Sequence, residues 1–98
     1  MNLNEELLKL RKNYNKMDLL LKIPAINMLK NFIPKEDKKI IIEKMEENPL
    51  SWWTLYHHFW GMAIRNKLRG KGFGEKYFKI NNLDDIYVFL VEDAVKGE

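Results

Sequence analysis

The spacing of apolar residues constrains the fold of this chain more than any other feature. Apolar side chains recur every three or four positions from Leu3 to Leu21 and again from Leu83 to Ala94, which places them on one face of a helix. The alternation that is typical of a strand is confined to Tyr77–Ile80. We therefore predict an all-α fold, a small bundle of four or five helices.

The chain has 98 residues, enough for one small hydrophobic core, and we expect a single helical domain over residues 1–98. Residues 1–49 are predicted to form N-terminal helices, and residues 50–98 a motif helix, a glycine-rich loop and a C-terminal helix. The absence of cysteine excludes disulfides and thiolate sites. The acidic opening and the lack of a long apolar run differ from a signal peptide or a membrane span, so we expect a cytoplasmic location.

Capping and helix-breaking residues set the expected boundaries of the N-terminal helices. Asn4 is a candidate N-cap, and Pro24 is expected to end or redirect the first helix. A second, short helix is expected over residues 25–32. A third begins at Pro34 and closes at Asn48–Pro49.

The second half of the chain centres on the motif helix, expected from an N-cap at Ser51 to Arg69. Because this helix is apolar nearly all round and rich in aromatic residues, we expect it to be the central, most buried helix. Gly70 is expected to end it, and Asn82 to cap a C-terminal helix that packs against it over residues 83–95. The glycine-rich segment between these two helices, residues 70–82, predicts a turn with at most a short extended piece. It does not predict a phosphate loop, because the dinucleotide-binding fingerprint follows a strand and opens a helix.

Charge is distributed unevenly along the chain, whose net charge is +3. Residues 51–79 carry six basic side chains and one acidic one, whereas residues 80–98 carry one basic and five acidic. Such a local excess would attract an anionic ligand. The same residues are equally consistent with a solvated basic helix end whose positive charge offsets the negative charge of the last helix.

The candidate site lies on the motif helix and at the start of the last helix. Trp53, His57, Gly61 and Arg65 follow one another four residues apart, which places them along one helical stripe. Glycine inside a helix is unfavourable, so Gly61 indicates the close approach of another helix or of a ligand. The candidate ligand-binding residues are Trp53, His57, His58, Arg65, Asn66, Arg69, Lys71, Asp84 and Asp85.

Arg65 has two interpretations. In the first, it offers its planar donors to a phosphate or carboxylate at the floor of a pocket, with His57 as a second donor. In the second, it forms an ion pair with Asp84 or Asp85 and so joins the motif helix to the last helix. Carboxylates in a first helical turn are also favoured by the helix dipole alone.

The sequence does not predict a metal site or a catalytic nucleophile. His57 and His58 are adjacent and so point about 100° apart on a helix, and no HExxH pattern accompanies them. Ser51 is the sole serine and lies at a helix cap. A general acid-base pair of His and Asp is conceivable, but we expect a protein that is not an enzyme and carries no cofactor or metal.

Two segments, HHFWGMAIRNKLR and NLDDIYVFLVEDAV, carry a family resemblance over roughly residues 50–95. They resemble an uncharacterised small domain family of bacteria and their phages, with a His-Phe-x-x-Gly-Met-x-Ile-Arg-Asn core and a downstream Asp-Asp pair. The family has no established activity, so the resemblance implies a grouping and no mechanism. It implies that some of the matching residues meet in space. The matching positions are His58, Phe59, Gly61, Met62, Ile64, Arg65, Asn66, Asp84 and Asp85.

Two classes of function follow. The first is a non-enzymatic binding protein, such as a phage-type accessory or anti-defence factor, that sequesters a phosphate-bearing small molecule such as a nucleotide signal. The second is a protein-protein interaction or structural module that inhibits or scaffolds a host protein. Nucleic-acid binding ranks third, because no reading motif is present. We also expect a homo-oligomer, since twelve aromatic residues are many for one small core. In the first class a base would stack on Trp52, Trp53, Tyr56 and Trp60.

Overall fold

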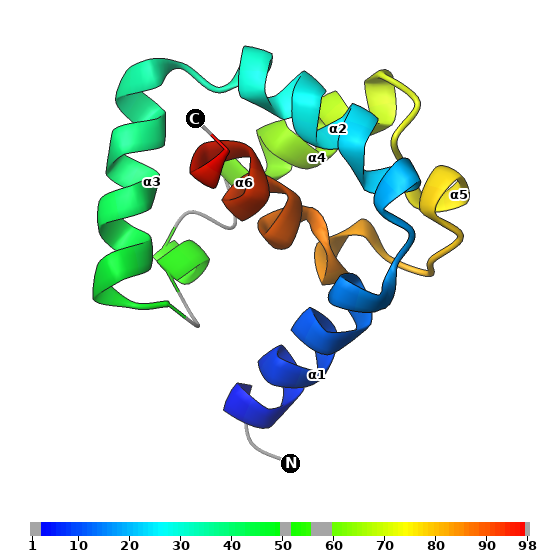
Figure 1. Ribbon diagram of the computed structural model, residues 1–98, viewed down its shortest axis with the longest axis horizontal. Coiled ribbons are helices and arrows are strands. Elements are labelled where there is room, and N and C mark those ends of the chain that lie inside the picture. Colours follow the sequence, from blue (N-terminus) through cyan, green and yellow to red (C-terminus); the bar gives the residue numbers. More distant parts are fainter. Residues whose placement is uncertain (1–2, 50–51, 56–59, 98) are drawn as a thin grey trace.

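The structure, a computed structural model, describes residues 3–49, 52–55 and 60–97 (Figure 1). Within these ranges every regular element is a helix, and five α-helices have ten residues or more. The predicted all-α fold, a small helical bundle, is confirmed. The elements are α1 (Leu3–Lys16), α2 (Leu19–Phe32), α3 (Lys35–Glu47), η1 (Trp52–Leu55), α4 (Trp60–Gly70), α5 (Glu75–Phe78), η2 (Leu83–Asp85) and α6 (Tyr87–Lys96).

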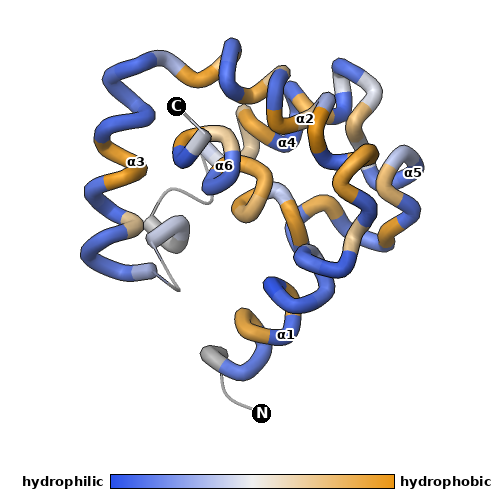
Figure 2. Tube along the Cα trace, viewed as in Figure 1, coloured by the Kyte–Doolittle hydropathy of each residue, from blue (hydrophilic) through white to orange (hydrophobic). Residues whose placement is uncertain are grey.

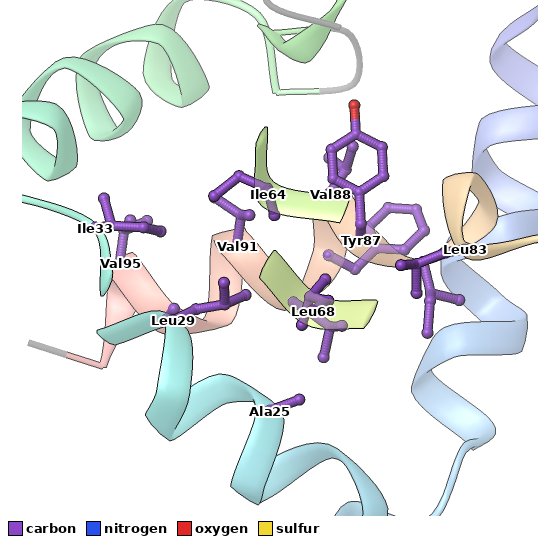
Figure 3. Close-up of a cluster of buried hydrophobic side chains, with 14 of the residues drawn as sticks. Ala25, Leu29, Ile33, Ile64, Leu68, Leu83, Tyr87, Val88, Val91 and Val95 are labelled. Carbon is purple, nitrogen blue, oxygen red and sulfur yellow. The ribbon is translucent and has the colours of Figure 1, made fainter. Parts of the chain in front are cut away.

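Helix α6 lies at the centre of the fold, with α2, α3 and α4 packed against it (Figure 1). Eight of its ten residues are buried, because its sequence is apolar on nearly every side. Leu29 of α2, together with Ile64 and Leu68 of α4, points toward it in the core (Figure 3). The predicted C-terminal helix over residues 83–95 is divided, because residues 83–85 form the 3₁₀ turn η2 and α6 begins only at Tyr87. The residues predicted for its apolar face are nevertheless all buried: Leu83, Ile86, Tyr87, Leu90, Val91 and Ala94.

The prediction that the motif helix is central and the most buried is therefore wrong. Residues 52–55 form a 3₁₀ turn, and the α-helix begins only at Trp60. On α4 the buried positions are Gly61, Ile64 and Leu68, a single stripe, whereas Met62 is 53% exposed. The polar residues of its second half require solvent, so α4 covers the core from one side. The predicted N-cap Ser51 lies outside the described residues.

The N-terminal helices divide at a different residue from the one predicted. Helix α1 begins at Leu3, so Asn4 lies inside it, and the break falls before Asp18 and not at Pro24. The Asp18 side chain accepts a hydrogen bond of 2.9 Å from the amide of Leu20 and so caps α2. Pro24 lies within α2. A capped start and buried packing of α2 on α6 outweigh the backbone hydrogen bond that proline removes.

The hydropathy of each helix agrees with its position relative to the central helix α6 (Figure 2). Helices α1 and α3 are mostly hydrophilic, whereas α2 and α6 carry more of the hydrophobic residues. Helix α3 ends at Glu47 with Asn48 as its C-cap, as the Asn-Pro pair predicted. The long outer helices therefore cover a core built mainly by α2, α4 and α6.

The glycine-rich segment after α4 turns as predicted but does not continue as an extended piece. Gly72 has a φ of 87°, in the left-handed region that favours glycine. Residues Glu75–Phe78 form the single helical turn α5, which ends at Lys79 in a left-handed conformation. Phe78 is buried, so burial of this ring holds the segment as a helix.

Candidate functional site

Arg65 and Asp84, both predicted site residues, are brought together. The Nε atom of Arg65 on α4 lies 3.0 Å from Oδ1 of Asp84 at the start of η2. The guanidinium carbon also lies 4.9 Å from the centre of the Tyr87 ring. The Arg65 side chain is 11% exposed and that of Asp84 is 40% exposed. This geometry is that of the ion pair in the second interpretation of Arg65, a contact that joins α4 to the last helix.

Gly61 of α4 lies against the side chain of Tyr87 of α6. A Cβ atom at this position would lie 2.6 Å from the hydroxyl oxygen of Tyr87 and 3.0 Å from Nη1 of Arg65. The space that glycine leaves is therefore filled by a tyrosine and an arginine of the chain itself. Burial raises the pKa of Tyr87 to about 12, against the lowering effect of Arg65, so the phenol stays neutral.

Arg69 is paired with a residue that the sequence did not single out. Its Nε and Nη2 atoms donate to Oε1 and Oε2 of Glu75 at 3.2 and 2.8 Å. Oε2 of Glu75 also accepts a hydrogen bond of 3.0 Å from the amide of Leu83. These hydrogen bonds, that from Arg69 first, lower the pKa of Glu75 to about 2. Glu75 thereby connects α4, α5 and η2. Two donors of the Arg69 guanidinium are therefore engaged by a carboxylate of the chain itself.

The remaining predicted site residues do not converge on one pocket. Asn66 and Lys71 are exposed. Asp85 lines a small cavity of about 140 Å³ together with residues of α1, including Tyr14. Trp53 is half-buried in η1 and so does not share an α-helical stripe with Arg65. The predictions for His57, His58 and Tyr56 concern positions outside the described residues.

Trp52 does not present a stacking surface. It is 2% exposed, and its indole Nε1 donates a hydrogen bond of 2.9 Å to Oε2 of Glu92 on α6. Trp60 meets it edge to face, with ring centres 6.1 Å apart. The hydrogen bond of Trp52 therefore connects η1 to the central helix α6.

Glu92 is a buried carboxylate that the sequence analysis missed. It is 3% exposed, and Nη2 of Arg11 on α1 lies 3.0 Å from each of its two oxygens. The Arg11 guanidinium in turn lies 4.7 Å from the centre of the Phe89 ring. One carboxylate therefore joins α1 and η1 to α6.

A second polar contact holds α1 on α6 one residue further along. The Tyr14 hydroxyl donates to Oδ2 of Asp93 at 2.6 Å. Lys22 of α2 donates to the Tyr14 carbonyl oxygen at 3.1 Å, and its ammonium lies 4.3 Å from the ring centre. Burial, followed by the hydrogen bond to Asp93, raises the pKa of Tyr14 well above its usual range, so this hydroxyl stays protonated.

An open cavity of about 420 Å³ lies beside Glu92, between α1, α3 and α6. Its volume falls within the range of small-molecule pockets. We call it the Glu92 cavity. The lining residues are Arg11, Ile42, Met45, Glu46, Pro49, Glu92 and Lys96.

Metal binding and membrane insertion receive no support from the part of the chain that is described. Within it, no group of three or more His, Cys, Asp or Glu side chains is placed to hold a metal ion. No helix there has the length and apolar character needed to cross a bilayer.

Comparison of the chain with protein-family models, with curated proteins and with solved structures gives no match. The resemblance noted over roughly residues 50–95 therefore stays a prediction.

Proposed function

We propose that the protein is a non-enzymatic binding protein whose ligand is a small anionic amphiphile, an aliphatic carboxylate, held in the Glu92 cavity. The observation that carries this proposal is the cavity itself, which combines an aliphatic wall with two cationic side chains beside a buried polar network. Among the cations first considered for ligand capture, Arg65 and Arg69 are each paired with a carboxylate of the chain, and Lys71 is exposed.

The wall of the cavity favours an aliphatic ligand over a nucleotide base. Ile42, Met45 and Pro49 supply its apolar surface, and the described lining contains no aromatic ring. A base would gain most from stacking on such a ring. An alkyl chain gains free energy simply by leaving water, about 0.8 kcal/mol for each buried CH₂ group.

The polar side of the cavity favours a carboxylate head group. Arg11 is fixed by Glu92 and by the Phe89 ring, and its guanidinium carries further N–H donors besides Nη2. Glu92 offsets the charge of Arg11, so Lys96 supplies the cationic attraction. Glu46 lines the same cavity and opposes an anion.

The polar groups favour binding over catalysis. Both oxygens of Glu92 are occupied by Arg11, and one of them also by Trp52. The Tyr14 hydroxyl is held by Asp93. Groups fixed in this way support the fold and position a ligand, whereas a general acid or base must reach the reacting atom.

Thermal unfolding with octanoate, octanol, octylamine and a set of nucleotides tests this proposal. Octanoate should raise the melting temperature most, since a ligand at 100 times its Kd stabilises by about 2.7 kcal/mol. Octanol should act more weakly, because it lacks the charge that Lys96 attracts. Octylamine should act more weakly than octanoate, because its ammonium group is repelled by Lys96.

Matched variants locate the site. Lys96→Gln should weaken octanoate binding by about threefold to tenfold, and Glu46→Gln should strengthen it, because each changes the charge beside the head group. Lys39→Gln, on the exposed surface of α3 and outside the lining, serves as the control. Equal effects of Lys96→Gln and Lys39→Gln, or stabilisation by nucleotides and not by octanoate, would refute the proposal.

One further prediction concerns the ion pair of the original candidate site. Arg65→Ala should lower the free energy of unfolding by about 1–2 kcal/mol, and Asp84→Asn by less than about 1 kcal/mol. The difference arises because Arg65→Ala removes both the ion pair and the contact with the Tyr87 ring, whereas Asp84→Asn keeps the ring contact and leaves an amide oxygen that can accept from Nε of Arg65. Urea unfolding measures both, and the double variant should cost little more than Arg65→Ala alone. A loss of about 3 kcal/mol from Asp84→Asn would contradict this account.

A further inference from the structure

The positive charge noted in the sequence gathers on the surface formed by the end of α4, the turn after it and α5. Residues 66–83 carry five basic side chains and one acidic side chain, which gives a net charge of +4. Figure 1 shows the turn and α5 at the edge of the molecule, on the side opposite α3. Lys71, Lys76 and Lys79 are exposed there, and we call these three lysines the basic surface.

The acidic residues near the basic surface are engaged inside the fold. Asp84 pairs with Arg65 of α4, whereas Glu92 and Asp93 accept hydrogen bonds from side chains of α1. The acid within the basic segment is held by an arginine of α4. Among the described residues, no carboxylate forms an ion pair with a lysine of the basic surface. The positive charge of these lysines therefore attracts anions from outside the chain.

An open groove of about 570 Å³ lies within the basic surface. A Cβ atom added to Gly72 would meet no other atom within 4 Å, so a ligand can come close to the backbone here. Lys76 supplies a cation to the groove, and Tyr77 supplies an aromatic ring. The lining residues are Arg69, Gly72, Gly74, Glu75, Lys76 and Tyr77.

The Tyr77 ring is half-buried and held in place from several directions. Its hydroxyl donates to the Leu21 carbonyl oxygen at 2.8 Å. The rings of Phe73 and Phe78 meet it edge to face, with ring centres 5.1 and 4.8 Å away. A ring fixed in this way loses little further freedom when a flat ligand stacks on it. Cations beside such a ring are the two features that single-stranded nucleic acid sites combine.

We propose that this groove binds single-stranded nucleic acid, with a base stacked on Tyr77 and the neighbouring phosphates held by the basic surface. Every base has a flat face and every nucleotide carries a phosphate, so binding of this kind requires no motif that reads a sequence. In a duplex the bases already stack on one another, which favours a single strand. The proposal does not depend on the Glu92 cavity, which shares no lining residue with the groove.

The number of cations sets the expected strength and salt dependence of binding. Non-specific nucleic acid binding has a Kd of about 10⁻⁶ to 10⁻⁴ M at physiological salt. Three lysines that each neutralise one phosphate of a single strand give a slope of about −2 for log K against log salt concentration. We therefore expect weak binding that is clearest at low salt.

Fluorescence anisotropy of a labelled oligothymidylate, from about 20 to about 200 mM NaCl, tests the electrostatic part. Lys76→Gln should weaken binding by about threefold to tenfold and make the slope shallower by about 0.7. Lys39→Gln makes the same change in net charge on the exposed surface of α3, and it should do neither. Circular dichroism checks that each variant is folded.

The Tyr77 ring is tested by comparing single-stranded and duplex DNA of equal length. Tyr77→Leu should weaken single-strand binding by about tenfold and leave duplex binding unchanged, because only the single strand offers a base for stacking. Tyr77→Phe keeps the ring and loses only the hydrogen bond to Leu21. It should bind the single strand like the wild type.

Glu75→Gln tests the charge of the groove in the opposite direction. It removes the acidic residue of the lining and frees Arg69 from its ion pair. The amide oxygen can still accept from the amide of Leu83. Binding of the oligothymidylate should therefore become about threefold stronger or more.

Several results would overturn the proposal. One is the lack of binding at low salt, and another is an equal effect of Lys76→Gln and Lys39→Gln. A duplex bound as tightly as the single strand, with Tyr77→Leu changing neither, would also overturn it. Binding to anionic lipid vesicles without binding to the oligothymidylate would assign the basic surface to a membrane instead. Lys96→Gln should leave nucleic acid binding unchanged, so failure of this proposal is distinct from failure of octanoate binding.

Discussion

Replacing Glu92 with alanine should lower the free energy of unfolding by about 2–4 kcal/mol, a large part of the stability of a small domain. The change removes the acceptor of two donors at once. Arg11 is 31% exposed and can turn toward water, but Trp52 is 2% exposed and its indole N–H would be left without a partner. The loss of that buried hydrogen bond accounts for much of the expected effect.

Urea unfolding of three variants tests this prediction. Glu92→Gln should cost less than Glu92→Ala, because the amide oxygen still accepts from Trp52. Glu43→Ala, on the exposed side of α3, should change stability by less than about 0.5 kcal/mol. In a Trp52→Phe background the effect of Glu92→Ala should shrink, since the stranded donor is gone. An effect of Glu92→Ala no larger than that of Glu43→Ala would show that the buried network contributes nothing.

Leu90→Ala should lower the free energy of unfolding by about 2–5 kcal/mol. Leu90 is fully buried on α6, the helix against which α2, α3 and α4 pack. Truncation leaves a cavity in the centre of the core, and the surrounding helices can relax only in part. This effect follows from the central position of α6.

Two exposed residues provide the controls for Leu90. Leu20→Ala is the same chemical change at a position that is 77% exposed, and it should cost less than about 0.5 kcal/mol at low protein concentration. Met62→Ala on α4 should be similarly small. Chemical denaturation of all three variants at one protein concentration distinguishes core positions from surface positions. A large effect of Met62→Ala would contradict the placement of α4 at the side of the core.

The fold class and the last helix could be predicted because their signals are local. Asn82 caps η2 by accepting a hydrogen bond of 3.0 Å from the amide of Asp84, and the three-and-four spacing after it identified the buried face. Asn48 likewise ends α3. The error at Pro24 has a physical reason: proline lowers helix stability locally, but the Asp18 cap and burial against α6 decide where α2 begins and continues.

The candidate site was predicted less well because its contacts are distant in the sequence. The pairing of Arg65 with Asp84 was one of two interpretations of Arg65. It could be considered because the motif helix and the C-terminal helix were expected to pack against each other. Glu92 had no local signal, since Glu92–Asp93 resembles the ordinary solvated acids of a helix. Its burial depends on Trp52 and Arg11, which lie 40 and 81 positions away.

The order of the elements has a consequence for biosynthesis. Helix α6 supplies the centre of the core, yet it follows α1 to α5 along the chain. While a ribosome is making those helices, the nascent chain lacks α6, against which the apolar sides of α2 and α4 pack. Arg11 and Tyr14 also lack their partners Glu92 and Asp93. Folding must therefore wait until residues 87–95 have left the exit tunnel, and chaperones that bind apolar segments have that whole interval in which to act.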